Sequence, residues 1–178
     1  WPTRAELHVT LASAALAARN AGATVRGWDP DPDVLRVAHE REAVEPASTL
    51  ADAVDGADLV LVAAPVADLP HVVREVLDLA SADCVVTDVG STKRTVVDAV
   101  DDERFIGGHP LAGAATAGVR HARAGLFDGA TWYLTPTERT VGVLYERLYR
   151  TLTSIGARPS AIAADAPESP PPTEPEAE

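Results

Sequence analysis

The sequence predicts an α/β fold with one doubly wound, mostly parallel sheet. Strand-like apolar runs alternate with helix-like segments along the chain, which is the pattern of a sheet covered by helices. The run at 58–64 is almost continuously apolar, as in strands buried on both faces. Residues 84–113 form a strand, a helix and a second strand, which right-handed crossovers join in parallel sheets. With 178 residues, the chain can build a single domain with a substantial core.

Helix-start and helix-stop residues divide the first half of the chain. Residues 11–21 are alanine-rich and predict a helix that Gly22 ends. Pro32 suits the first turn of a helix that Asp31 caps. The other elements expected here are a strand at 23–28, a helix from 32 to about 41, a short helix at 50–54 behind Ser48-Thr49, a strand within 58–64 and a helix at 70–79.

The second half is organised around the strand–helix–strand unit. Its first strand runs from Cys84 to Val89 and stops at Gly90-Ser91, and its second, Phe105-Ile106, stops at Gly107–Pro110. The remaining expected elements are a helix from 92 to 100, a short helix before 126, a strand at 130–134, a helix at 140–155 with apolar residues near one face, and a strand at 157–163. From 165 the chain is acidic and proline-rich, so we expect a domain over 1–164 and a disordered tail over 165–178.

Composition excludes several function classes. The net charge of −12 argues against nucleic acid as a partner, because phosphates favour basic surfaces. No apolar run is long enough to cross a membrane and no signal peptide is evident, so we expect a cytoplasmic protein. The single cysteine, Cys84, excludes an internal disulfide and is expected in the core. The histidines expected at the surface, without metal-site spacing, are His8, His39, His71 and His121.

Two polar residues follow neighbouring strands of the central unit. Ser91 and His109 fall just beyond the carboxyl ends of these strands, where parallel sheets bind ligands. A hydroxyl and an imidazole at one sheet edge suit a proton-transfer site. Two structural alternatives remain open: Ser91 can cap the helix that follows it, and His109 can be a loop residue without a role.

Asp29 ends the strand after the alanine-rich helix, where a dinucleotide fold places the acid that binds the adenosine ribose. A carboxylate there favours NAD over NADP, although Asp29 can equally start a turn with Pro30. The glycine-rich turn that contacts the pyrophosphate is missing. Its glycine positions fall near Glu6, His8 and Leu11, and Glu6 would bring negative charge towards a phosphate. We therefore expect the first strand and its turn to be degraded.

Several longer segments carry a more specific signal. They are GWDPDP at 27–32, ADLVLVAAPV at 57–66, VVTDVGSTK at 85–93, RFIGGHPLAG at 104–113 and GLFDGATWYLTPT at 125–137. In order and spacing, over roughly 12–162, they resemble the Rossmann-like nucleotide-binding domain of prephenate dehydrogenases, the enzymes of tyrosine biosynthesis. Dehydrogenases of the 3-hydroxyacid type are the second enzyme class considered, but the GS-x-K and GGHP segments argue against them.

The resemblance implies an NAD-dependent oxidative decarboxylation of prephenate to 4-hydroxyphenylpyruvate. His109 matches the family's catalytic histidine, which accepts the proton of the substrate hydroxyl, and an imidazole has a suitable pKa. Ser91 matches a serine that forms hydrogen bonds in the same centre. The cofactor-binding residues implied by the resemblance, with Asp29 from the argument above, are Asp29, Ala64, Pro65, Val66 and Gly90.

This sequence departs from the family at two places. Residues 113–118 lack the acid and base of the family's polar run, and the match ends where a helical, dimer-forming, substrate-binding domain would begin. Three hypotheses therefore stay open. The chain is a prephenate dehydrogenase, with arogenate as a close alternative substrate; a non-catalytic Rossmann-like remnant that binds a nucleotide or a protein; or a fragment whose ends, including the start at Trp1, reflect a frameshift or gene-prediction error.

The missing first strand has a physical consequence. In this fold that strand lies in the middle of the sheet, flanked on both sides. Its neighbours would present unpaired backbone edges unless residues 6–11 replace it. We therefore expect marginal stability or self-association.

Overall fold

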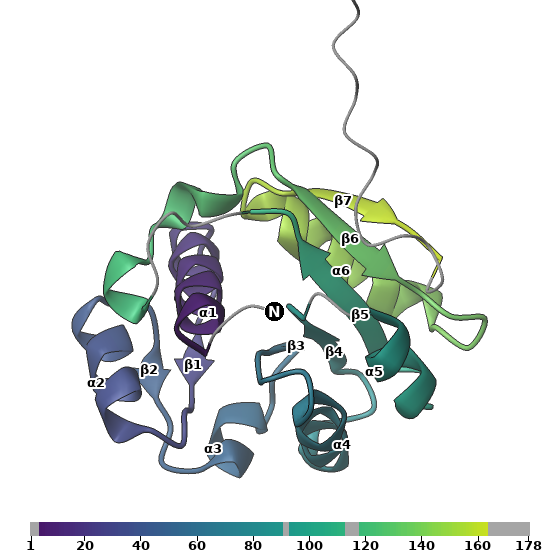
Figure 1. The fold of residues 1–178 in the computed structure, drawn as a ribbon, viewed down its shortest axis with the longest axis horizontal. Coiled ribbons are helices and arrows are strands. Elements are labelled where there is room, and N and C mark those ends of the chain that lie inside the picture. The colour runs from purple at the N-terminus through teal and green to yellow at the C-terminus, as the bar shows by residue number, and fades with distance from the viewer. Residues whose placement is uncertain (1–3, 91–92, 113–117, 164–178) are drawn as a thin grey trace, which may run out of the picture.

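The computed structural model describes residues 4–90, 93–112 and 118–163 of the chain (Figure 1). The α-helices are α1 (Arg4–Asn20), α2 (Pro32–Glu40), α3 (Leu50–Val54), α4 (Leu69–Leu79), α5 (Lys93–Ala99) and α6 (Gly142–Ser154). The strands are β1 (Arg26–Gly27), β2 (Glu45–Pro46), β3 (Leu59–Val62), β4 (Val85–Asp88), β5 (Phe105–Pro110), β6 (Thr131–Thr135) and β7 (Arg158–Ala161). Short 3-10 helices are η1 (Val119–His121) and η2 (Ala124–Phe127).

The main sheet is five-stranded, in the order β3-β4-β5-β6-β7. Its pairings are parallel except for the antiparallel pair β5–β6, and β1 and β2 form a separate parallel pair. This confirms the predicted α/β class with a mostly parallel sheet. The structure also shows two separate sheets where one was predicted, because β1 does not pair with β3.

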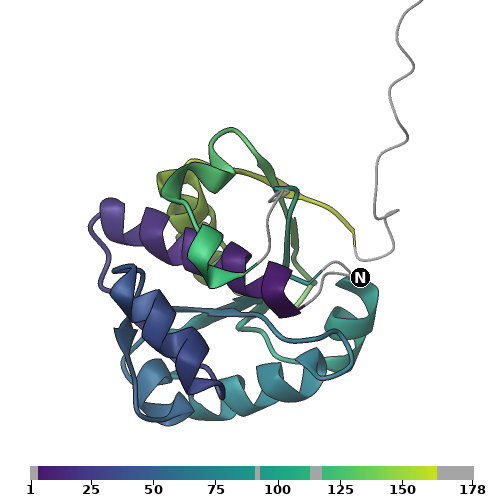
Figure 2. The ribbon, with the colours of Figure 1, turned by 60° about the vertical axis from the view of Figure 1, so that its left-hand side comes forward.

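Helices cover both faces of the sheet (Figures 1 and 2). Neighbouring strand residues point to opposite faces. Val85 therefore packs in a core with α1 and α6, whereas Val86 packs in a second core with α3, α4 and α5. Cys84 belongs to the second core with no exposed surface, as expected, and burial raises the pKa of its thiol.

The amino-terminal helix is longer than predicted. It begins at Arg4 instead of near residue 11, about two turns earlier, so residues 6–11 do not replace the missing strand. No glycine or proline interrupts residues 4–20, and Val9 and Ala12 add buried contacts against α2 and η1. Among the described residues, β1 and β3 therefore have no neighbouring strand on the side where they would have met.

Strand β5 extends further than predicted and changes its partner. Phe105 and Ile106 pair with β4, and the strand then continues from Gly107 to Pro110, paired with β6. The prediction that the strand stops at Gly107 is therefore wrong. The two glycines do not end the strand, because the chain continues through them in antiparallel register with Thr131–Thr135.

The helix starts in the first half follow the predicted caps. The Asp31 carboxylate accepts a hydrogen bond of 3.0 Å from the Asp33 backbone N–H, at the start of α2. The Thr49 hydroxyl accepts one of 3.1 Å from the Asp52 N–H, and α3 has the predicted bounds. The predicted tail, 165–178, lies outside the described residues and stays a prediction.

Candidate functional site

A buried carboxylate lies at the carboxyl end of β4. Asp88 is the last residue of this strand and has no exposed surface. Its Oδ2 accepts a hydrogen bond of 2.8 Å from the Gly90 N–H, and its Oδ1 accepts one of 2.9 Å from the Gly108 N–H. The carboxylate thus connects the turn after β4 to strand β5. Our sequence analysis missed Asp88, although an acid that closes a buried apolar run and precedes a glycine by two residues is a readable signal.

His109 lies on β5 and is half-buried. Its ring contacts the turn after β4, which contains Gly90. Its Nδ1 is 3.2 Å from the Gly90 carbonyl oxygen. Because a carbonyl can only accept a hydrogen bond, Nδ1 carries the proton in the neutral ring and Nε2 keeps its lone pair. The structure therefore holds this imidazole in the tautomer that can accept a proton at Nε2.

Close approach of strands makes this arrangement possible. A Cβ on Gly108 would lie 2.4 Å from the Asp88 carbonyl oxygen and 2.6 Å from the Thr87 hydroxyl, so no larger residue fits without movement. A Cβ on Gly90 would lie 2.8 Å from the Leu69 Cδ2. The two glycines bring β5, the turn after β4 and helix α4 within contact distance.

The predicted cofactor loop, Ala64 to Val66, follows the carboxyl end of β3. The Pro65 carbonyl accepts hydrogen bonds from the backbone N–H groups of Asp68 (2.8 Å) and Leu69 (3.0 Å), which begin α4. Since Leu69 is fully buried and lies against Gly90, the loop is tied to the turn that holds His109. The structure thus brings this loop, Gly90 and His109 to one sheet edge, whereas Ser91 lies outside the described residues.

Asp29 lies just beyond β1, at the carboxyl end of the smaller sheet. Its Oδ1 accepts a hydrogen bond of 2.8 Å from the Asp31 N–H, which is the turn that the alternative interpretation expects. Its Oδ2 is 3.2 Å from Nε2 of His8 on α1. The expectation that His8 is a surface residue is wrong, because packing of α1 leaves only 14% of its side chain exposed.

The site offers groups for the ribose of a dinucleotide and for its end near His109, but not for its pyrophosphate. Asp29 offers a carboxylate for a ribose, and the loop after β3 and Gly90 offer backbone at the edge that carries His109. However, helix α1 occupies the stretch where a glycine-rich turn would contact a pyrophosphate, and Glu6 is on it. Beyond the first turn of this helix, the backbone N–H groups bond to carbonyls of the helix itself, so the described residues do not form a glycine cradle.

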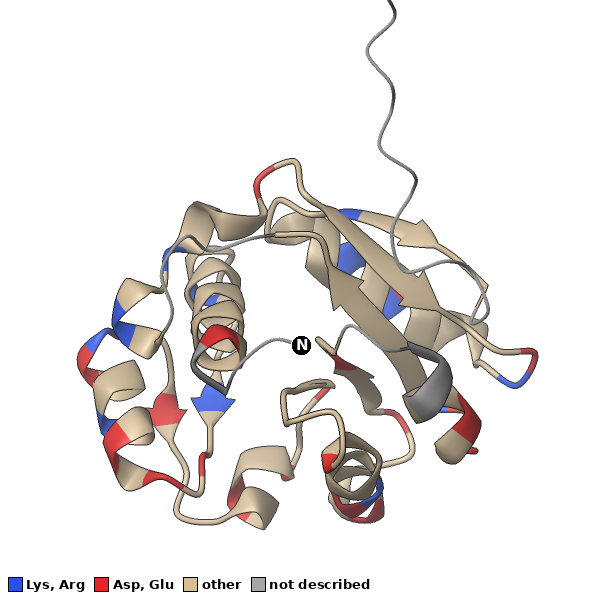
Figure 3. Ribbon diagram, in the orientation of Figure 1, with Lys and Arg blue, Asp and Glu red and all other residues tan. Residues whose placement is uncertain are grey.

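Charged residues and metal-binding groups have an uneven distribution in the structure. Charged residues lie mainly on helices and connecting segments, and the long strands β5 and β6 carry none (Figure 3). Within the described ranges, no group of three metal-ligating side chains is present. The helices in those ranges also include none that is long and apolar enough to cross a membrane.

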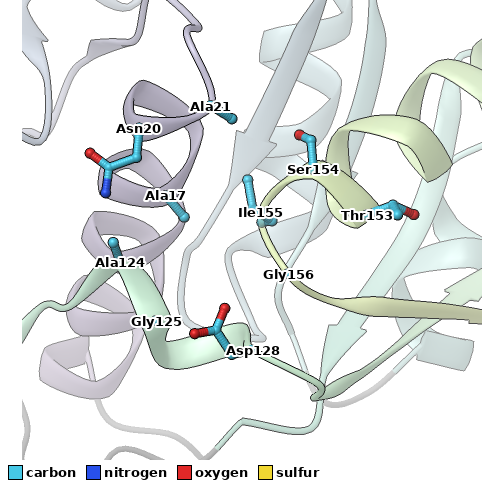
Figure 4. A pocket seen from close by; sticks show the side chains of 10 residues that line it. All are labelled: Ala17, Asn20, Ala21, Ala124, Gly125, Asp128, Thr153, Ser154, Ile155 and Gly156. Carbon is cyan, nitrogen blue, oxygen red and sulfur yellow. The ribbon is translucent and has the colours of Figure 1, made fainter.

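A hollow of about 480 Å³ lies at the other end of α1 (Figure 4). It is lined by Ala17, Asn20, Ala21, Ala124, Gly125, Asp128, Thr153, Ser154, Ile155 and Gly156. A Cβ on Gly156 would meet an oxygen of the Asp128 carboxylate at 2.4 Å, so this acid is packed against the backbone. None of the predicted site residues lines the hollow.

Comparisons with known proteins give a consistent result. The family model described as the prephenate dehydrogenase nucleotide-binding domain matches residues 14–160. The prephenate dehydrogenase of Bacillus subtilis (strain 168) is 37% identical over 70 residues, which are 36% of this chain and 19% of that protein.

Solved structures agree in fold. A prephenate dehydrogenase from Aquifex aeolicus is similar with a TM-score of 0.79 and 27% identity, over 86% of this chain and 58% of that one. An arogenate dehydrogenase from Synechocystis has a TM-score of 0.79 and 27% identity, over 88% and 57%. A further A. aeolicus structure, in complex with hydroxyphenyl propionate and NAD+, has a TM-score of 0.77 and 25% identity, over 86% and 56%. This chain therefore spans only part of the length of these relatives.

Proposed function

The chain belongs to the family of prephenate dehydrogenase nucleotide-binding domains, and from this premise we propose that it serves the NAD-dependent oxidation of prephenate or arogenate, with His109 as the proton acceptor. One observation carries the proposal: His109 Nδ1 lies 3.2 Å from the Gly90 carbonyl oxygen, which leaves Nε2 as a base. The similarity to an A. aeolicus enzyme in complex with NAD+ supports the choice of cofactor.

The proposed chemistry divides into a proton step and a hydride step. Nε2 of His109 accepts the proton of the hydroxyl group on the substrate ring, so that the oxygen can form a carbonyl as the hydride leaves its carbon. Bound NAD would supply the hydride acceptor beside His109. The ring carboxylate would then leave as carbon dioxide, the electrons of the broken bond would complete the aromatic ring, and the oxygen would take its proton back from His109 to become the phenol hydroxyl.

Other residues of the chain would bind and orient. The backbone of Ala64, Pro65 and Val66 and that of Gly90 would contact the cofactor beside His109. Asp29 would accept hydrogen bonds from ribose hydroxyls. We propose Ser91 as a hydrogen-bonding group of the same centre, because it follows Gly90 directly.

A second candidate function is a Rossmann-like domain that does not catalyse and binds a nucleotide or a protein. The observation that favours it is the pairing of Asp29 with His8, on a helix that fills the place of the glycine-rich turn. In this case the ribose carboxylate is already engaged and the pyrophosphate lacks its usual backbone donors.

Calorimetry followed by turnover separates the candidates. We would titrate NAD into the purified chain and into an Asp29→Ala variant, and then follow NADH formation with prephenate and with arogenate. We expect NAD binding that Asp29→Ala weakens, and turnover that His109→Asn lowers on the order of 100-fold or more while NAD binding persists. A folded chain that does not bind NAD contradicts the first candidate and supports the second.

A further inference from the structure

We infer that Asp88 is a positioning residue, whose buried carboxylate fixes the turn after β4 against β5 and thereby orients the ring of His109. The catalytic consequence of this inference rests on the proposed function. The geometric part does not, because the state of the His109 ring can be measured without turnover.

The hydrogen bonds of Asp88 and His109 form a closed loop. The Asp88 carboxylate accepts from Gly90 N–H (2.8 Å) on one side and from Gly108 N–H (2.9 Å) on the other. The residue after Gly108 is His109, and its Nδ1 returns to the carbonyl oxygen of Gly90 at 3.2 Å. One side chain therefore fixes both the backbone that carries the imidazole and the carbonyl that the imidazole contacts.

The geometry requires a carboxylate. A buried charge is costly unless hydrogen bonds satisfy it, and backbone N–H groups from two segments converge on these two oxygens. An Asp88→Asn substitution keeps the shape but replaces one acceptor oxygen by an NH2 group, which cannot accept from a facing N–H. The amide can therefore keep only one of the two contacts, and the turn is no longer connected to β5 on both sides.

The position of the Gly90 carbonyl decides which nitrogen of His109 bears the proton. In the structure the carbonyl holds the proton on Nδ1 of the neutral ring, so that the lone pair is on Nε2. If the turn moves away, the neutral ring loses the contact that favours this tautomer. A ring protonated on Nε2 cannot accept a proton there, so loss of Asp88 would reduce the fraction of molecules with a usable base.

A neighbouring residue offers a matched control. Thr87 precedes Asp88, is also fully buried, and its hydroxyl has no hydrogen-bond partner among the described residues. A Thr87→Val substitution preserves the shape and removes a polar atom from the same strand. It perturbs the region next to Gly108 without touching the Asp88 carboxylate.

Nitrogen-15 NMR of the imidazole rings tests the inference directly, with the His109 signals assigned by their loss in His109→Asn. At a pH where the ring is neutral, we expect the wild type and Thr87→Val to show Nδ1 protonated. In Asp88→Asn we expect a shift of population to the Nε2-protonated form. A folded Asp88→Asn variant with the wild-type tautomer signature overturns the inference.

A measurement on the wild type keeps the test decisive if Asp88→Asn does not fold. The backbone amides of Gly90 and Gly108 should then be protected from hydrogen exchange to a similar degree, because one carboxylate binds both. Rapid exchange of either amide, beside protected neighbours in β4, overturns the inference.

Kinetics separates this inference from the proposed function. If the chain turns over prephenate or arogenate, Asp88→Asn should lower kcat on the order of 100-fold, as expected when a base is misplaced. An equal kcat in Asp88→Asn and the wild type contradicts a positioning role. Absence of turnover in the wild type contradicts the proposed function alone, and the tautomer measurement still decides the role of Asp88.

Discussion

Nε2 of His8 lies 3.2 Å from Oδ2 of Asp29, and this contact joins helix α1 to the carboxyl end of β1. Both side chains are mostly buried, with 14% and 18% of their surfaces exposed. Asp29 is the acid proposed to bind the ribose, so the helix that replaces the glycine-rich turn also supplies a partner for it. A dinucleotide would have to compete with His8 for this carboxylate.

Substitution of His8 by alanine should therefore strengthen NAD binding. We expect the Kd to fall about fivefold, which corresponds to the roughly 1 kcal/mol of a typical hydrogen bond. Calorimetry measures the change, and His71→Ala, an exposed histidine on α4, is the control that should leave the Kd unchanged. Weaker binding in His8→Ala would mean that His8 supports the site instead of competing for it.

Alanine at Gly108 should destabilise the protein by about 2–3 kcal/mol, because the added methyl group meets the backbone of β4 and cannot be accommodated by rotation of a side chain. Gly142, the first residue of α6, is the matched control, since a Cβ there meets no atom within 4 Å. Urea unfolding of both variants measures the free energies. Equal stability of Gly108→Ala and Gly142→Ala would refute the close approach of β5 to Asp88.

The Asp102–Arg104 pair should make stability depend on pH in the acid range. The Arg104 guanidinium donates a hydrogen bond of 2.8 Å to Asp102, which holds the pKa of this carboxyl below its ordinary value of 3.8. A carboxyl whose pKa is lower in the folded than in the unfolded protein adds to the free energy of unfolding. This contribution is complete at a pH above the unfolded-state pKa, and it is lost as the pH falls through the folded-state pKa. Asp102→Asn should therefore lower stability by about 1 kcal/mol at pH 7, and less as the pH falls below about 4.

Thermal unfolding over a pH series checks this dependence. Asp101→Asn is the control, because Asp101 pairs with Arg139 at an exposed site, where we expect little effect. A difference between Asp102→Asn and the wild type that persists unchanged at the lowest pH would assign the loss to packing and not to charge.

No strand of the described part of the chain pairs with the outer edge of β3, and this edge should be visible in hydrogen exchange. The carbonyl of Asp58 accepts a hydrogen bond from Val85 of β4, and that of Val62 accepts one from Val89, just after β4. Because backbone groups alternate between the two edges of a strand, those of Leu61 point to the opposite edge. We expect the Leu61 amide to exchange much faster than the Val62 amide, and its protection to rise with protein concentration if the edge mediates self-association. Strong protection of Leu61 in dilute solution, with a monomer in sedimentation, would contradict an open edge.

The sequence by itself determined the elements and the family. Helix and strand periods are local, so alternating segments predict a mostly parallel α/β fold without knowledge of contacts. The caps at Asp31 and Thr49 are equally local, since each side chain binds a backbone N–H two or three residues away. The early start of α1 was also readable from residues 4–10, which contain no glycine or proline.

Only the tertiary structure decided the geometry of the site. Asp88 and Gly108 are 20 residues apart, and His8 and Asp29 are separated by a helix and a strand, so no local pattern pairs them. Likewise, β5 remains a strand beyond its glycines because β6 supplies partners from the far side of a long connection. These contacts depend on how close two backbones approach, and that distance is set by packing of the whole core, not by the residues at the contact alone.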